Sequence, residues 1–208
     1  MFARMNRNVN AAFSSRWLIA GLLGLLSSVA AIAQSQELRL QFDPAKTTIG
    51  FTLGDILHTV HGSFRLKSGD VGYNIGSKSV SGNLIVDATS GQSGNHSRDH
   101  KMHKEILESE QYPVISFRPD GVQGNVGSLG SSTIQVHGIF SIHGDDHGLT
   151  MPVRVEVFPD HWTADTHFTI PYVKWGMKNP STFVLRVSES VEIDVHASGG
   201  NPSSGGAH

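Results

Sequence analysis

The amino-acid sequence predicts an all-β fold of about eight strands with one short helix. Apolar and polar residues alternate with a period of two through most of residues 34–197, which is the pattern of strands with one buried and one solvated face. Gly, Asp and Pro residues separate these stretches and favour turns. One stretch, residues 97–109, has helical spacing instead. A single helix of that length cannot cover eight strands, so the sheet must bury its own apolar face.

The first 33 residues have the organisation of a secretory signal peptide. They contain three arginines and no acidic residue, then an apolar run from Trp17 to Leu26, then Ala31-Ile32-Ala33. The apolar run is about half of the roughly 20 residues that a membrane span needs. We therefore expect cleavage after Ala33 and export of the remaining chain to the periplasm.

The composition of residues 34–208 excludes several classes of site. The chain has no cysteine, so disulfides, thiolate metal sites and cysteine nucleophiles are excluded. No run of Lys or Arg follows residue 33, and the net charge of the whole chain is −2. We expect no nucleic-acid partner, because binding phosphates calls for a concentrated basic surface.

The expected strands are defined by the apolar residues that share one face of each. In chain order these sets are Ile49/Phe51/Leu53, Val60/Phe64/Leu66, Val80/Leu84/Val86, Ile115/Phe117, Ile134/Val136/Phe140/Ile142, Met151/Val153/Val155/Val157, Trp162/Ala164/Phe168/Ile170 and Phe183/Leu185/Val187 continuing through Val191/Ile193/Val195. Turns are expected at residues 67–70 and 144–148.

The helix and the C-terminal tail complete the domain. Ser97 is a suitable N-cap, and Met102, Ile106 and Leu107 fall near helical spacing. Residues 198–208 are rich in Gly and Ser and predict a disordered tail after a domain spanning 34–197. By periodicity alone, a closed barrel and a two-layer sandwich satisfy the burial requirement equally well.

Short motifs spread along the chain resemble the YceI-like polyisoprenoid-binding family. They are Phe42-Asp43-Pro44, Ile49-Gly50-Phe51, Val60-His61-Gly62-Ser63-Phe64, Val86-Asp87-Ala88, Arg98-Asp99, Tyr112-Pro113-Val114-Ile115-Ser116-Phe117, Val136-His137-Gly138 and Ile170 to Gly176. One motif departs from the family pattern, because Lys101 stands where the family's Arg-Asp-x-His-Leu has its histidine.

The resemblance implies an eight-stranded antiparallel lipocalin-like barrel with the helix near its mouth. It also implies a polyisoprenoid or isoprenoid-quinone-like lipid in an apolar tunnel, with the head group selected at the mouth. Aromatic residues on the buried faces suit such a tunnel, and Tyr172, Lys174 and Trp175 suit its rim. The residues expected to line the ligand site are Phe51, Val60, Phe64, Leu84, Met102, Ile106, Phe117, Ile134, Phe140, Phe168, Tyr172, Trp175, Phe183 and Leu185.

Catalysis and metal binding are the rival hypotheses. His96, His100 and His103 have spacings that suit a divalent metal on one side of a helix, and a hydrolase or a filled, ligand-free interaction domain is the alternative to a carrier. The chain has no His-Glu-x-x-His and no Gly-x-Ser-x-Gly elbow, so we expect solvated histidines, no catalytic residue, no metal and no cofactor. Transient contact with a membrane and a homodimer are left open.

Overall fold

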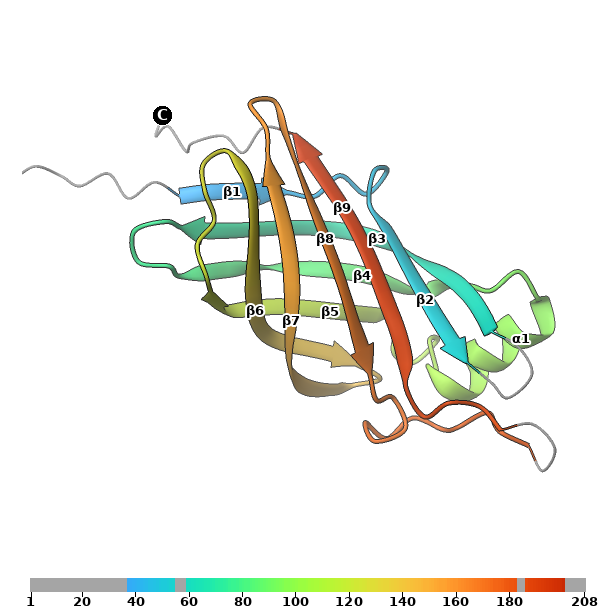
Figure 1. The fold of residues 1–208 in the computed structure, drawn as a ribbon. Coiled ribbons are helices and arrows are strands. Elements are labelled where there is room, and N and C mark those ends of the chain that lie inside the picture. The colour runs from blue at the N-terminus through green and yellow to red at the C-terminus, as the bar shows by residue number, and fades with distance from the viewer. Residues whose placement is uncertain (1–36, 55–58, 183–185, 201–208) are drawn as a thin grey trace, which may run out of the picture. The chain divides into compact units, whose positions relative to one another are not determined.

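The computed structural model describes residues 37–54, 59–182 and 186–200 (Figure 1). All of them belong to the compact unit that starts at Gln34. The expected signal peptide, Phe183 and Leu185 lie outside the described residues. No helix in the described ranges is long and apolar enough to span a membrane.

Within the described ranges, this unit contains nine strands and one helical segment. The strands are β1 (Glu37–Gln41), β2 (Thr48–Gly54), β3 (Thr59–Asn74), β4 (Val80–Gln92), β5 (Val114–Gln123), β6 (Gly130–Ile142), β7 (Asp145–Val157), β8 (His161–Ile170) and β9 (Val191–Gly200). The helical segment between β4 and β5 consists of α1 (His96–Lys101) and a π-helical turn, η1 (Met102–Ile106).

The strands form one antiparallel sheet that closes on itself. Its order is β1-β3-β2-β9-β8-β7-β6-β5-β4, and β4 also pairs with β3. Strands β1 and β2 both pair with β3, β1 along residues 70–74 and β2 along residues 59–64. They therefore share one position around an eight-stranded barrel, as the sequence predicted, and closure removes the exposed sheet edges.

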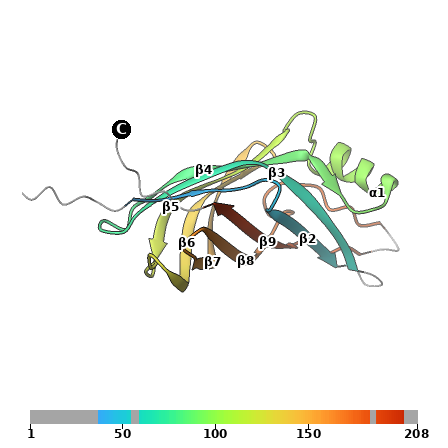
Figure 2. The ribbon, with the colours of Figure 1, turned by 90° about the horizontal axis from the view of Figure 1, so that it is seen from above.

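The helical segment lies at one end of the barrel, away from β1 (Figures 1 and 2). Asn95 is its N-cap, and the Asn95 side chain accepts a hydrogen bond from the backbone N–H of Arg98 at 3.0 Å. The expected cap at Ser97 is therefore wrong by two residues. Asn95 takes the role because its backbone is extended and its side-chain oxygen reaches the first free N–H groups.

One expected turn is strand in the structure, and the other is shorter than expected and begins one residue earlier. Residues 67–70 lie inside β3, which bends there through a register shift against β4 between Leu66 and Ser68 instead of reversing direction. The β6–β7 hairpin turns on two residues, His143 and Gly144, because Ile142 pairs with Asp145. Both turn residues have positive φ, 55° and 85°, which suits the twist of a two-residue hairpin.

The last strand extends beyond the expected start of the tail. Strand β9 runs to Gly200, and Ser198, Gly199 and Gly200 pair with Thr163, Trp162 and His161. Gly199 is needed there because a Cβ would lie 2.0 Å from the Gln41 carbonyl oxygen and 2.6 Å from Trp162 Nε1. The Gly-rich composition that predicted disorder at 198–200 thus reflects close packing of backbone against a large side chain.

Candidate ligand-binding cavity

A cavity of about 730 Å³ runs through the inside of the barrel. Its volume is within the range of about 300–1,000 Å³ that small-molecule sites occupy. Side chains from all nine strands and from the helical segment line it. The inward side chains are therefore divided between packing on one another and facing this space.

Eleven of the fourteen residues expected in the ligand site line this cavity. They are Phe51, Val60, Phe64, Leu84, Met102, Ile106, Phe117, Ile134, Phe140, Phe168 and Tyr172. Trp175 does not line it, while Phe183 and Leu185 lie outside the described residues. Whether these side chains contact a ligand stays a prediction.

Two hydrophobic clusters occupy the two ends of the barrel. The first, here the Trp162 end, has as its buried members Leu38, Leu40, Tyr73, Val126, Ile134, Val155, Val157, Trp162 and Ala197. The second, here the α1 end, has Ala88, Leu107, Ile115, Phe140, Ile142, Ile170, Tyr172 and Met177. Met102 and Ile106 from η1 pack against the second cluster.

The Trp162 end contains the large side chain that is fully buried among the described residues. Trp162 is 0% exposed, and the Phe42 ring meets it edge-on with centroids 4.7 Å apart. Sequence reasoning missed β1, which supplies Leu38 and Leu40 here, although Glu37, Arg39 and Gln41 alternate with them. Five residues were too short a run to separate from the preceding segment.

The charged residues of the described cavity lining lie at the α1 end. Among the described residues that line the cavity, the charged ones are Arg98 and Lys101. Arg98 donates to Ser93 Oγ through Nε at 2.7 Å and to the Ser93 carbonyl oxygen through Nη2 at 2.9 Å. Lys101 Nζ donates to the Pro180 carbonyl oxygen at 3.3 Å. Arg98 is exposed, so the cavity reaches the surface beside α1.

The three residues expected at the rim have different surroundings. Tyr172 is buried, and its hydroxyl donates to the Ser188 carbonyl oxygen at 2.7 Å. Burial, followed by the nearby Glu189 charge, raises the pKa of Tyr172 to about 12. Trp175 packs between Phe140 and His147, stacking on the His147 ring at 4.1 Å, and Lys174 is exposed.

The helix histidines are not equivalent. His96 and His100 are exposed as expected, but His103 is half-buried. Its Nε2 lies 2.8 Å from the Gly91 carbonyl oxygen and its Nδ1 lies 2.8 Å from Ser109 Oγ. Nε2 must carry the proton because a carbonyl only accepts. The expectation of a solvated His103 is wrong, since this ring fastens η1 to β4.

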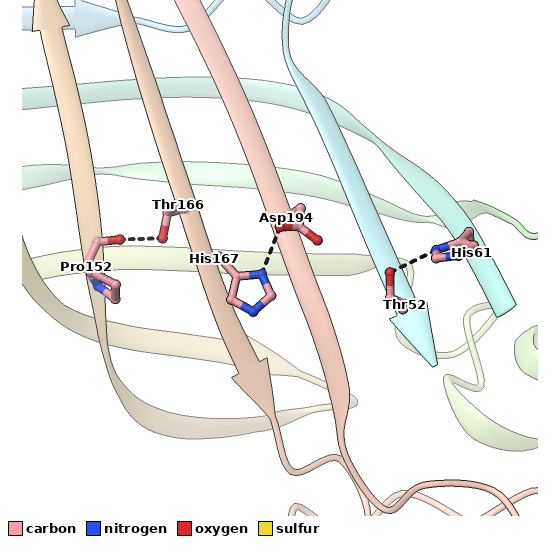
Figure 3. A network of polar contacts seen from close by, with 6 residues as sticks. All are labelled: Thr52, His61, Pro152, Thr166, His167 and Asp194. Carbon is pink, nitrogen blue, oxygen red and sulfur yellow. Dashed lines mark hydrogen bonds and ion pairs between the residues drawn. The ribbon is translucent and has the colours of Figure 1, made fainter. Parts of the chain in front are cut away.

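No metal centre is evident in the part of the chain that the structure describes. Within those ranges, no group of three or more His, Cys, Asp or Glu side chains is placed to hold a metal ion. On the outer wall, His167 and Asp194 face each other across β8 and β9 with Nδ1 2.8 Å from Oδ1 (Figure 3). His143 is half-buried beside Glu108, with Nε2 to Oε2 at 3.3 Å.

Comparison with known proteins identifies the domain. The model of the YceI-like domain matches residues 40–198. No curated protein matches the chain significantly. A structure of Burkholderia cenocepacia BcnA has a TM-score of 0.64 at 19% identity, covering 76% of this chain and 99% of that one.

Two further solved structures share the fold. A polyisoprenoid binding domain from Saccharophagus degradans, described as implicated in plant cell wall breakdown, has a TM-score of 0.59 at 16% identity over 78% of this chain and 98% of that one. A Campylobacter jejuni YceI protein has a TM-score of 0.57 at 13% identity, covering 70% and 86% of the two chains. Identities this low bear on the fold alone.

Proposed function

The chain belongs to the YceI-like domain family, and on that premise we propose that it binds a polyisoprenoid or isoprenoid-quinone-like lipid for storage or transport. The observation that carries this proposal is the cavity of about 730 Å³ inside the barrel, whose charged lining is confined to α1 among the described residues. A largely apolar space whose charged lining residues lie at one end suits an elongated amphipathic molecule. The fold it shares with the Saccharophagus degradans polyisoprenoid binding domain supports the same ligand class.

Affinity in such a cavity comes mainly from removing apolar surface from water. Each Å² of buried apolar area contributes roughly 25 cal/mol, so several isoprene units suffice for useful binding without many polar contacts. The expected consequence is weak discrimination between prenyl chains of similar length. Discrimination between ligands then falls to polar groups at the ends of the cavity.

The proposal includes export before lipid binding. The support is the arginine-containing start, the short apolar run and the Ala31-Ile32-Ala33 site of the sequence. Fractionation and N-terminal sequencing should find a soluble periplasmic species that begins near Gln34. Recovery of an intact Met1 in the inner membrane would contradict export and leave the ligand proposal standing.

Extraction of gently purified protein is the direct test of the ligand. Organic extraction and mass spectrometry should recover an isoprenoid in near-stoichiometric amount. Absence of any extractable lipid, together with absence of binding by a labelled prenyl chain, would reject the carrier function and favour an interaction domain.

A pair of matched substitutions tests whether the lipid binds inside the cavity. Ala164 lines the cavity, whereas Thr169 on the same strand is exposed on the outer face. Ala164→Phe should fill the space and lower prenyl affinity at least 10-fold, while Thr169→Phe should leave affinity unchanged. Equal binding by the two variants would show that the lipid lies elsewhere.

A further inference from the structure

Two buried polar atoms at the Trp162 end have no partner in the protein. Within the described part of the chain, Thr47 Oγ1 and Trp162 Nε1 are buried and make no hydrogen bond. Thr47 is 8% exposed and Trp162 is 0% exposed. Both residues line the cavity. A buried donor without a partner costs free energy, so each such group in a native fold needs an explanation.

The pairing of β9 places both residues at the same end. Thr48 pairs with His196, so Thr47, the residue before it, lies beside Ala197. Trp162 pairs with Gly199, two residues further along β9. Ala197 and Trp162 belong to one buried cluster, so Thr47 and Trp162 flank β9 on opposite sides at the same end of the barrel.

The polar side chains of the cavity lining at the α1 end differ in this respect. The third unpartnered buried atom among the described residues, His147 Nε2, belongs to a residue outside the lining. Arg98 and Lys101 already donate to Ser93 and to Pro180. Thr166, which also lines the cavity, donates its hydroxyl to the Pro152 carbonyl oxygen at 2.7 Å (Figure 3). These three side chains therefore make hydrogen bonds within the protein. Thr47 Oγ1 and Trp162 Nε1 make none and are free to bind another molecule.

The chemistry of the two atoms defines the group that would complete them. An indole N–H only donates, and a threonine hydroxyl can donate as well. The charged residues among the described cavity lining, Arg98 and Lys101, are on α1, so an ionised group at the Trp162 end would lack a counter-charge. The complement is therefore an uncharged oxygen acceptor, such as a carbonyl, ether or hydroxyl oxygen.

We propose that Thr47 and Trp162 form a polar subsite at the deep end of the cavity that binds an uncharged oxygen carried by the lipid. This inference rests on the proposed lipid-binding function and adds the position and chemistry of a selecting group. A lipid with such an oxygen at the end that enters first is preferred over a pure hydrocarbon chain.

The test compares two probes that differ in one oxygen. Geranylgeraniol and the hydrocarbon of the same skeleton are titrated into the parent protein, Thr47→Val and Thr166→Val. Thr47→Val should weaken binding of the alcohol about 5- to 10-fold, the range of one neutral hydrogen bond, and leave the hydrocarbon nearly unaffected. Thr166→Val should change both affinities by a similar factor, because its hydroxyl already has a protein partner.

The stability of the ligand-free protein is a second readout, in which the two threonine variants should change the urea midpoint in opposite directions. Thr47→Val removes an unpartnered hydroxyl with little change of shape, so the urea midpoint should rise. Thr166→Val removes a partnered hydroxyl, so the midpoint should fall. A fall for Thr47→Val would mean that the hydroxyl is already satisfied, for instance by a bound water, and would overturn the subsite.

The indole N–H of Trp162 reports the contact directly. In protein labelled with ¹⁵N-tryptophan, its resonance is identified by its absence in Trp162→Phe. Geranylgeraniol should move this proton downfield and the hydrocarbon should not. If the parent binds both probes while this resonance and the Thr47→Val affinity ratio are unchanged, the subsite is wrong and the carrier function stands. If the parent binds neither probe, both fail.

Discussion

The two ends of the barrel are built from the same alternating strands but are closed by different residues. At the Trp162 end, an entirely buried indole, the Phe42 ring and a glycine with no room for a Cβ close the wall. At the α1 end, closure depends on a helical segment of six plus five residues held by side-chain hydrogen bonds. From this difference we expect truncations at the Trp162 end to cost more stability, and we expect the proposed ligand to enter at the α1 end.

Replacing Trp162 by alanine should have the largest effect. The change removes a side chain that is 0% exposed and should lower the free energy of unfolding by about 3–5 kcal/mol. Urea unfolding of the ligand-free protein measures it. A loss below about 1 kcal/mol would show that the Trp162 end is not the stable part.

Phe140→Ala tests the α1 end with a comparable truncation. Phe140 is 8% exposed and lines the cavity, with the Phe168 ring at 6.3 Å. Part of its surface faces open space, so ligand-free protein should lose about 2 kcal/mol, less than the 3–5 kcal/mol of a filled core. With prenyl lipid bound, the loss should grow, because affinity falls too. Equal losses in both lipid states would contradict a cavity beside Phe140.

His103→Ala tests how the helical segment is fastened. The ring bonds the Gly91 carbonyl oxygen and Ser109 Oγ, so its loss should cost about 1–2 kcal/mol. Hydrogen exchange of the amides in η1 should accelerate more than that of the amides near Trp162. His100→Ala is the matched control: His100 is exposed on the neighbouring turn, and its effect should stay within about 0.5 kcal/mol.

Tyr172→Phe should have the smallest effect at neutral pH and a distinct effect in alkali. Losing the bond to Ser188 should cost about 1 kcal/mol. The pKa of Tyr172 is raised from 10.0 to about 12, so its contribution is fully present below pH 10 and is lost as the pH rises through about 12. The parent should therefore lose more stability than Tyr172→Phe between these values. Parallel pH profiles would disprove the assignment.

Period-two alternation predicted the cavity wall well because it requires local information alone. Once a residue such as Phe117 or Phe168 lies on the apolar face of its strand, barrel closure places it inside. The alternation could not show which strands pair to close the barrel. The prediction of a barrel instead of a sandwich came from the family resemblance.

The errors share a physical cause, which is dependence on distant partners. Gly199 belongs to a strand because it pairs with Trp162, which is 37 residues earlier in the sequence. His103 is bonded because β4 brings the Gly91 carbonyl to it. Thr47 and Trp162 are brought to the same end of the barrel by β9, and no spacing in the sequence relates them. Propensity and period describe neighbours along the chain and cannot report such contacts.

The pairing of β2 with β9 also determines how the chain can fold. From β3 onward each strand pairs with the one before it along the chain, whereas β2 meets β9 across a long separation, with Thr48 opposite His196. Among the strand pairings of the barrel, closing that loop carries the largest entropy cost. The β2–β9 seam should therefore form last and limit the folding rate, so that a nascent chain carries an open, unpaired sheet until its final strand is available.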